Sequence, residues 1–333
     1  MKKLLLVFFL FSFQFSLFAQ IGGSSTFEFL NLNTSPRIIA LGGYLTSILD
    51  DDINNGIYNP ALINSSMLYK SNLNYTNYYT DILYGDVGYC FNLAGYNFIS
   101  SIKFIDYGQF VETDLFGNRL GEFSAGEYMV SLGSSMNLDS LFSLGLTAKI
   151  AYSSLYELSS LGFLIDFGFS YMHPKKDLVA SLIIKNLGYQ IVPYYHGYRE
   201  SMPFEIVAGI SNKLAHMPLR WHLTIQHLET PNLSFDNTNL TVMSSHDNIM
   251  SNILMHIVVG AEFLIHRNAS LLIGYNNRRR FEMIIEDRRG LVGFSFGFSF
   301  RVKRFHFNYS RTLNHFSGGV NSFGITTNLK KND

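Results

Sequence analysis

The chain is poor in several kinds of residue on which many folds depend. It has one cysteine, Cys90, and one tryptophan, and 15% of its 333 residues are charged, against about 25% in an ordinary soluble domain. A single cysteine excludes a disulfide framework and a cysteine zinc site. The 25 basic residues equal the 25 acidic ones, so the chain lacks the positive field that holds nucleic acid.

Aromatic and apolar residues are abundant instead. The chain contains 30 Phe and 20 Tyr, and 47% of it is apolar, which is too much for a disordered protein. After the first twenty residues, no segment has the roughly 18 uninterrupted apolar residues that a membrane-spanning helix needs. The length fits one or two soluble domains or one medium-sized membrane barrel, and composition does not choose between them.

The first nineteen residues have the pattern of a secretory signal peptide. Lys2 and Lys3 form a basic start, an apolar stretch follows, and Ala19 is the small residue before the predicted cleavage site. Cleavage would leave 23 basic and 25 acidic residues, a net charge of −2. An exported chain without a spanning helix is either a soluble secreted protein or an outer-membrane β-barrel.

Alternation with a period of two runs through most of the mature sequence and predicts fourteen strands. The runs are 69–79, 83–91, 96–104, 128–136, 144–150, 163–171, 178–184, 204–210, 221–225, 257–263, 271–275, 292–300, 305–309 and 323–329. In the run 292–300, for example, Phe alternates with Gly and Ser, as expected of a strand that faces lipid on one side. A soluble β-sandwich would also alternate, but it would not normally need so many aromatic residues on one face.

The lengths of the connections give an independent test. Every second connection is short, at 92–95, 137–142, 173–177, 212–219, 264–269 and 301–303. The others are mostly longer and include 105–127, 187–202, 228–255 and 276–290, although the first hairpin, near 80–82, is tight. Short periplasmic turns and long outer loops are typical of outer-membrane barrels. We therefore predict an all-β fold, a transmembrane antiparallel β-barrel over residues 68–333, located in the outer membrane.

Residues 20–67 do not alternate, and we predict that they form a plug or periplasmic segment. Residues 37–43 are expected to form a helical turn that ends at glycine, and Asn59-Pro60 predicts a second turn. A barrel of fourteen strands can enclose a small plug. The aspartates 50–52 lack the spaced ligands of a calcium loop, so we expect a solvated turn or a plug contact. The predicted plug motif consists of Arg37, Leu41, Gly42, Gly43, Asn59, Pro60, Ala61 and Leu62.

These plug motifs, together with several later segments, resemble the PorQ family, an outer-membrane component of the type IX secretion system of Bacteroidota. The later segments are 117–125, 185–188, 227–229, 256–263 and 275–279, so the resemblance covers the whole mature chain. Pro36 departs mildly from the family, which more often has alanine there. The Asn-Pro-Ala element is less specific, since it recurs across the wider FadL-like superfamily.

The resemblance implies a FadL-like barrel of fourteen strands with an N-terminal plug. It also implies membership of a surface attachment complex that contains a sortase-like protease, a PorV-like shuttle barrel and a PorZ-like surface protein. That complex releases cargo from its C-terminal signal and joins it to anionic lipopolysaccharide. A PorQ-like barrel would anchor the PorZ-like protein, and the resemblance implies neither an enzyme nor a cofactor.

Two groups of residues are candidate contacts on the outer side. Loops on a rigid scaffold commonly carry binding, and the possible partner contacts are Tyr194, Tyr195, His196, Leu233 and Phe235. Guanidinium groups bind phosphate well, and the possible lipopolysaccharide contacts are Arg278, Arg279, Arg280, Arg288 and Arg289. A polar hairpin in which these arginines pair with neighbouring carboxylates is the plainer interpretation.

Catalytic and metal-binding motifs are weak. The segment 293–297 matches G-x-S-x-G, but it lies inside an alternating strand, whereas a hydrolase nucleophile needs a sharp strand-to-helix turn. His222 and His227 are five residues apart and fall on opposite faces of a strand. We predict no catalytic residue, metal or cofactor. Two alternatives remain open: a FadL-like channel for hydrophobic small molecules, and a barrel phospholipase that uses Ser295.

Overall fold

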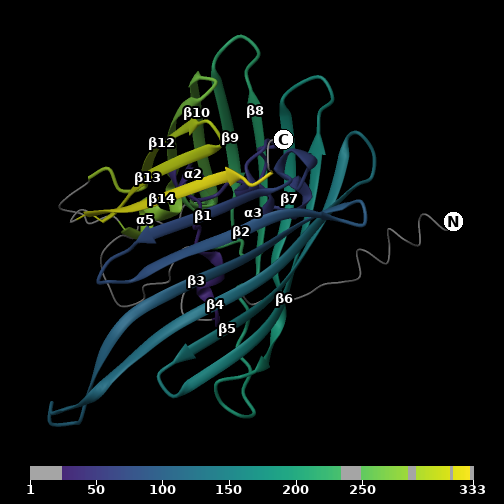
Figure 1. Cartoon of the computed structure of the whole chain (residues 1–333). Helices are drawn as coiled ribbons and strands as arrows, with labels where there is room; N and C mark the ends of the chain where they lie inside the picture. The colour runs from purple at the N-terminus through teal and green to yellow at the C-terminus, as the bar shows by residue number, and fades with distance from the viewer. Residues whose placement is uncertain (1–24, 234–248, 284–289, 316–317, 331–333) are drawn as a thin grey trace.

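The computed structural model is a closed barrel of fourteen antiparallel strands (Figure 1). It describes residues 25–233, 249–283, 290–315 and 318–330. Each strand pairs with its neighbours in sequence, and β1 closes the barrel against β14, where Leu73 lies opposite Ile325. The prediction of an all-β barrel with fourteen strands is confirmed.

The strands are β1 (Lys70–Asn77), β2 (Leu83–Leu93), β3 (Tyr96–Thr113), β4 (Arg119–Asn137), β5 (Phe142–Leu155), β6 (Leu158–Met172), β7 (Leu178–Val192), β8 (Glu205–Lys213), β9 (Leu219–Ile225), β10 (Ile257–His266), β11 (Ala269–Asn276), β12 (Phe294–Val302), β13 (Phe305–His315) and β14 (Gly318–Asn328). The helical elements are η1 (Glu28–Asn31), α2 (Pro36–Ala40), α3 (Ile53–Tyr58), η2 (Pro60–Leu62), η3 (Ser65–Met67), α4 (Ile249–Met255) and α5 (Asn277–Met283). Across the described residues, no helix is long and apolar enough to cross a membrane.

The two faces of the wall differ as the alternation predicts. On β1, Leu73 and Tyr75 point outward and are exposed, whereas Asn72 and Asn74 point inward and are buried. On β12, Phe296 and the other phenylalanines form the outer face. An apolar exterior and a polar interior match a barrel that lies in lipid.

The two ends of the barrel also differ. At one end, which we call the short-turn mouth, the described connections are 94–95, 138–141, 173–177, 214–218, 267–268 and 303–304. At the other end, the long-loop mouth, lie the connections 193–204, 226–256 and 277–293, and the last two contain α4 and α5. The sorting of connections by length therefore holds only in part: the long connections all lie at one mouth, but the same mouth also has tight turns at 78–82, 114–118 and 156–157.

Three of the predicted long loops are wrong in detail. Residues 105–127 are mostly strand, because β3 and β4 continue as a paired hairpin to Thr113 and Arg119. A β-bulge after Asp106 shifts the alternation and hides this pairing in the sequence. β7 similarly continues to Val192 past an irregularity near Asn186, which has a φ of 58°. The connection 276–290 begins with helix α5 rather than forming a hairpin.

The segment before β1 lies inside the barrel (Figure 1). It starts near the long-loop mouth, where the amide of Thr26 donates to the carbonyl of Ser201 at 2.9 Å. It then runs down the lumen through η1 and α2 and reaches the short-turn mouth at residues 50–52. α3, η2 and η3 lead back to β1 along the inner wall. We refer to residues 25–69 as the plug.

Candidate functional site

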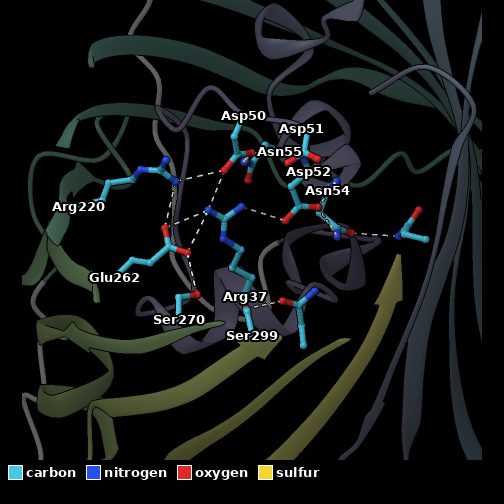
Figure 2. Close-up of polar contacts among 12 residues, drawn as sticks. Arg37, Asp50, Asp51, Asp52, Asn54, Asn55, Arg220, Glu262, Ser270 and Ser299 are labelled. Atoms are coloured by element: carbon cyan, nitrogen blue, oxygen red, sulfur yellow. Dashed lines mark hydrogen bonds and ion pairs between the residues drawn. The ribbon is translucent and has the colours of Figure 1, made fainter. Parts of the chain in front are cut away.

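A buried ion-pair network joins the plug to the wall near the short-turn mouth (Figure 2). Arg37 lies in α2, whose first residue, Pro36, has no amide hydrogen of its own to leave unpaired. One guanidinium nitrogen donates to Asp52 at 3.1 Å. The other donates to Asp50 at 2.8 Å and to Glu262 of β10 at 3.0 Å. A single cation thus connects the start of the plug, its turn at the short-turn mouth and the barrel wall.

A second arginine completes the network from the wall. Arg220 of β9 lies 3.0 Å from Glu262 and 3.2 Å from Asp50. The hydroxyl of Ser270 also donates to Glu262 at 3.2 Å. Burial alone would raise the pKa of Asp50, but Arg37 and Arg220 outweigh it and lower that pKa from 3.8 to about 2. The carboxylate is therefore ionised at neutral pH.

The neighbouring Asp51 faces the opening instead. It pairs with Lys70 at the start of β1 and, at 3.0 Å, with Arg301 of β12. Of the two interpretations for the three aspartates, plug contact is the one observed. Asp50 and Asp51 bind the plug to β1, β9 and β12, and Arg37 binds it to β10.

Helix α2 packs on Leu272 of β11 and approaches the wall most closely where the wall has glycine. Gly274 and Gly297 face it, and a Cβ atom at either position would collide with residues 40–42 of the plug. The helical turn ends at Gly42 and Gly43, whose φ values are 97° and 88°, as the sequence predicts for a glycine terminus. The ring of His222 in β9 donates to the carbonyl of Leu41 at 3.0 Å.

The Asn-Pro-Ala element is a second attachment point, on the opposite side of the lumen. The side chain of Asn59 donates to the carbonyl of Thr46 at 2.7 Å and accepts from the amide of Ala61 at 3.0 Å. Ser143 of β5 donates to the carbonyl of Ala61 at 2.8 Å. Pro60 and Leu62 are buried in η2, which packs against β4, β5 and β6. The predicted plug motif is therefore divided between two sites that both contact the wall.

Three lysines on alternate strands line the lumen between these sites and the long-loop mouth. Lys103 of β3 donates to the plug carbonyls of Leu30 and Leu32 at 3.0 and 2.6 Å. Lys149 of β5 pairs with Asp166 at 2.5 Å. These side chains are buried and hydrogen-bonded.

The third lysine, Lys185 of β7, pairs with a carboxylate as Lys149 does: it lies 2.9 Å from Glu205 of β8. Toward the long-loop mouth from the lysines, Phe27 and Phe29 of the plug form an apolar cluster with residues of the wall such as Leu164. The lumen is thus occupied by paired charges and by the plug's own aromatic rings.

At the long-loop mouth, the predicted partner contacts have different environments. Tyr195 is 61% exposed and His196 is also exposed, whereas the hydroxyl of Tyr194 donates to Ser153 of β5 at 2.6 Å. The side chain of Leu233 is only 4% exposed, so its prediction as a surface contact is wrong in this structure. Phe235 lies outside the described residues.

Of the five predicted arginine contacts, the structure describes three, all in α5. Arg278 pairs with Glu282 one helical turn away at 2.6 Å. Arg279 turns inward and donates to Ser295 at 3.0 Å. Arg280 donates to the carbonyls of residues 290 and 292. Arg288 and Arg289 lie outside the described residues. Of the three described arginines, Arg278 alone pairs with a neighbouring carboxylate, and contact with lipopolysaccharide stays a prediction.

Ser295 does not have the setting of a nucleophile. It is completely buried near the start of β12 and pairs in register with Thr312 of β13, and the chain continues from it as strand rather than turning into a helix. In the described parts of the chain, no group of three or more His, Cys, Asp or Glu residues is arranged to hold a metal ion.

Comparison with known proteins supports the fold. No protein-family model and no curated protein matches the sequence. Among solved structures, the chain resembles the toluene transporter TbuX of Ralstonia pickettii, with a TM-score of 0.55 and 11% identity over 90% of this chain and 99% of that one. It also resembles the toluene transporter TodX of Pseudomonas putida, with a TM-score of 0.53 and 11% identity over 89% and 96% of the two chains. The chain therefore shares the fold of these two transporters, and its own sheet is a closed barrel of fourteen antiparallel strands.

The sequence points to Arg37 but not to its partners in the wall. Arg220 and Glu262 lie opposite each other on β9 and β10 with their side chains in the lumen. The available signal is their place on the polar face of predicted strands, where a charged residue must find a partner. Which partner each one takes depends on the path of the plug, which alternation does not describe.

Proposed function

We propose that this chain is a PorQ-like barrel that anchors a surface protein at the outer membrane. The partner would be a PorZ-like protein next to a sortase-like protease and a PorV-like barrel, in a complex that attaches cargo to lipopolysaccharide. The motifs that resemble the PorQ family suggest the partner. The state of the lumen supports an anchoring role over a conducting one.

The observation that carries the proposal is the attachment of the plug along the lumen. The plug is bound to the wall by ion pairs at Arg37, by the hydrogen bond from Ser143 to the carbonyl of Ala61 and by apolar packing at Phe29. Removing one partner of a buried ion pair lowers stability by about 3–5 kcal/mol. Displacing the plug would therefore carry a large cost in free energy. A barrel that is closed in this way offers its mouths, rather than its interior, for function.

The long-loop mouth offers apolar surface to a partner. Tyr195 and Tyr198 are exposed in the connection between β7 and β8. In α4, the side chains of Ile249, Met250 and Ile253 are exposed as well. Large apolar side chains that face outward on a soluble surface commonly mark interaction sites.

The test is purification of a tagged barrel from outer membranes in mild detergent, combined with a deletion strain. We expect the PorZ-like protein to copurify with the barrel, and to appear in the medium instead of on the cell surface when the barrel is deleted. An unchanged amount of the surface protein on cells of the deletion strain would contradict the proposal.

The second candidate is a channel for hydrophobic small molecules. The specific observation in its favour is the likeness in fold to TbuX and TodX, both toluene transporters. The relevant test is uptake of radiolabelled toluene by cells with and without the barrel. An anchor predicts no difference. As a positive control, cells that carry the toluene transporter TbuX should take up toluene in the same assay.

A further inference from the structure

The hairpin of β3 and β4 projects from the long-loop mouth beyond the other described connections (Figure 1). β2 starts at Leu83, opposite Asp106, and β5 ends at Leu155, opposite Ala125. Residues 107–124 therefore continue beyond both neighbouring strands. At about 3.3 Å per residue, the continuation from 107 to 113 is on the order of 20 Å long.

Apolar side chains stand at the tip of this projecting hairpin. Leu115 is fully exposed and Phe116 is 91% exposed. The turn that carries them is ordered by Asp114, whose carboxylate accepts hydrogen bonds from the amides of Phe116 and Asn118 at 2.9 and 2.8 Å. The two side chains are thus held in water by a well-formed turn, at a cost in free energy that burial against a partner would remove.

Aromatic packing stiffens the stem of the hairpin. Phe110 of β3 stacks on Phe123 of β4, with ring centroids 5.3 Å apart. Tyr156, in the turn between β5 and β6, packs edge-on against Phe123 and donates to Glu112 at 2.7 Å. Isolated two-stranded hairpins are only marginally stable in water, so this packing explains how the projection keeps its shape.

The hairpin is also acidic. Within residues 107–124, Glu112, Asp114 and Glu122 carry negative charge, and Arg119 is the only basic residue. The complementary surface is therefore an apolar depression surrounded by lysine or arginine side chains. An anionic lipopolysaccharide layer is not complementary, because like charges repel.

We propose that the β3–β4 hairpin is the principal docking element for the surface protein, and that Leu115 and Phe116 insert into an apolar depression with a basic rim on that protein. This inference rests on the proposed anchoring function and adds the contact surface to it. The sequence alone favours the connections 187–202 and 228–255 as the main contact with the partner. This inference assigns the main contact to the hairpin instead.

The test measures binding of the purified PorZ-like protein from the same genome to the full barrel in lipid nanodiscs. Leu115→Ser/Phe116→Ser should weaken binding by about 30-fold or more, as expected when an interface loses central anchors. Glu122→Lys should weaken it further at low salt and reduce its dependence on salt concentration. The matched control is Leu138→Ser/Met217→Ser, which alters two exposed apolar side chains, at 53% and 56%, at the short-turn mouth and should leave binding unchanged.

Each other outcome contradicts the proposed docking surface, and the outcomes can be told apart. Equal binding by the parent and the hairpin variant overturns the docking surface and leaves the anchoring function intact. Failure of the parent to bind overturns both. Loss of binding to lipopolysaccharide vesicles, or loss of self-association by the barrel, in the hairpin variant alone would assign the tip to those occupants instead. Migration on gels with and without boiling shows that each variant is folded.

Discussion

Replacement of Arg37 by methionine should destabilise the protein more than any single change at its surface. Methionine keeps much of the side-chain volume but leaves Asp52 without its cation and leaves Asp50 and Glu262 to share Arg220. Removing one partner of a buried ion pair costs about 3–5 kcal/mol. We expect the free energy of unfolding to fall by this amount, because Asp52 and Glu262 stay buried and Asp50 stays 19% exposed.

The pH dependence of that loss follows from Asp50. Its pKa of about 2 lies below the unfolded value of 3.8, so its ionisation contributes about 2 kcal/mol at neutral pH. This contribution is complete above the unfolded pKa and is lost as the pH falls through the folded one. Without Arg37 the pKa of Asp50 should rise. The difference in stability between the parent and Arg37→Met should therefore shrink between pH 4 and pH 2.

Urea unfolding in lipid or detergent, followed through the fluorescence of Trp221, is a suitable assay because this is the only tryptophan in the chain. The matched control is Arg301→Met at the same mouth. Arg301 and its partner Asp51 are 42% and 37% exposed, so this change should cost less than about 1 kcal/mol. The reasoning is refuted if the two variants lose the same stability, or if the gap between Arg37→Met and the parent does not depend on pH.

Two further predictions concern the other contacts between the plug and the wall and the charges in the lumen. Gly145→Ala places a methyl group against the backbone of the Asn-Pro-Ala turn, so it should cost about 1–3 kcal/mol by overpacking in the same unfolding assay. Gly290→Ala, where the methyl group meets nothing within 4 Å, should be silent. Lys185→Met leaves Glu205 buried without its nearest cation and should cost about 3–5 kcal/mol. Lys213→Met removes an exposed pair and should cost less than about 1 kcal/mol; equal losses for the two lysine variants would contradict the assignment.

The wall of the barrel is predictable from sequence because each of its strands obeys one local rule. Alternation reports which side chains meet lipid, and it does so without knowledge of any partner strand. The rule fails where the backbone departs from regular pleating. The bulge after Asp106 and the irregular turn at Asn186 shift the alternation by one residue, and in both places a real strand resembles a loop.

The contacts of the plug are less predictable because they depend on spatial and not on sequence neighbours. Arg37 and Glu262 are 225 residues apart in sequence and 3.0 Å apart in space. Glycine positions such as Gly274 are equally silent in sequence, since their purpose is to leave room for α2. The Asn-Pro-Ala turn is an exception, because proline and an asparagine that caps its own turn act locally.

An anchoring role and a conducting role predict different effects of substitutions at the charged residues. In the lumen, charged side chains such as Arg37 and Lys185 are buried and paired, so they stabilise one arrangement of the plug. On the hairpin, Glu122 is exposed to whatever approaches the long-loop mouth. If the barrel is an anchor, changes in the lumen should reduce stability and leave partner affinity intact, and changes on the hairpin should do the reverse. If the barrel is a channel, substitutions along the lumen should instead alter transport before they alter stability.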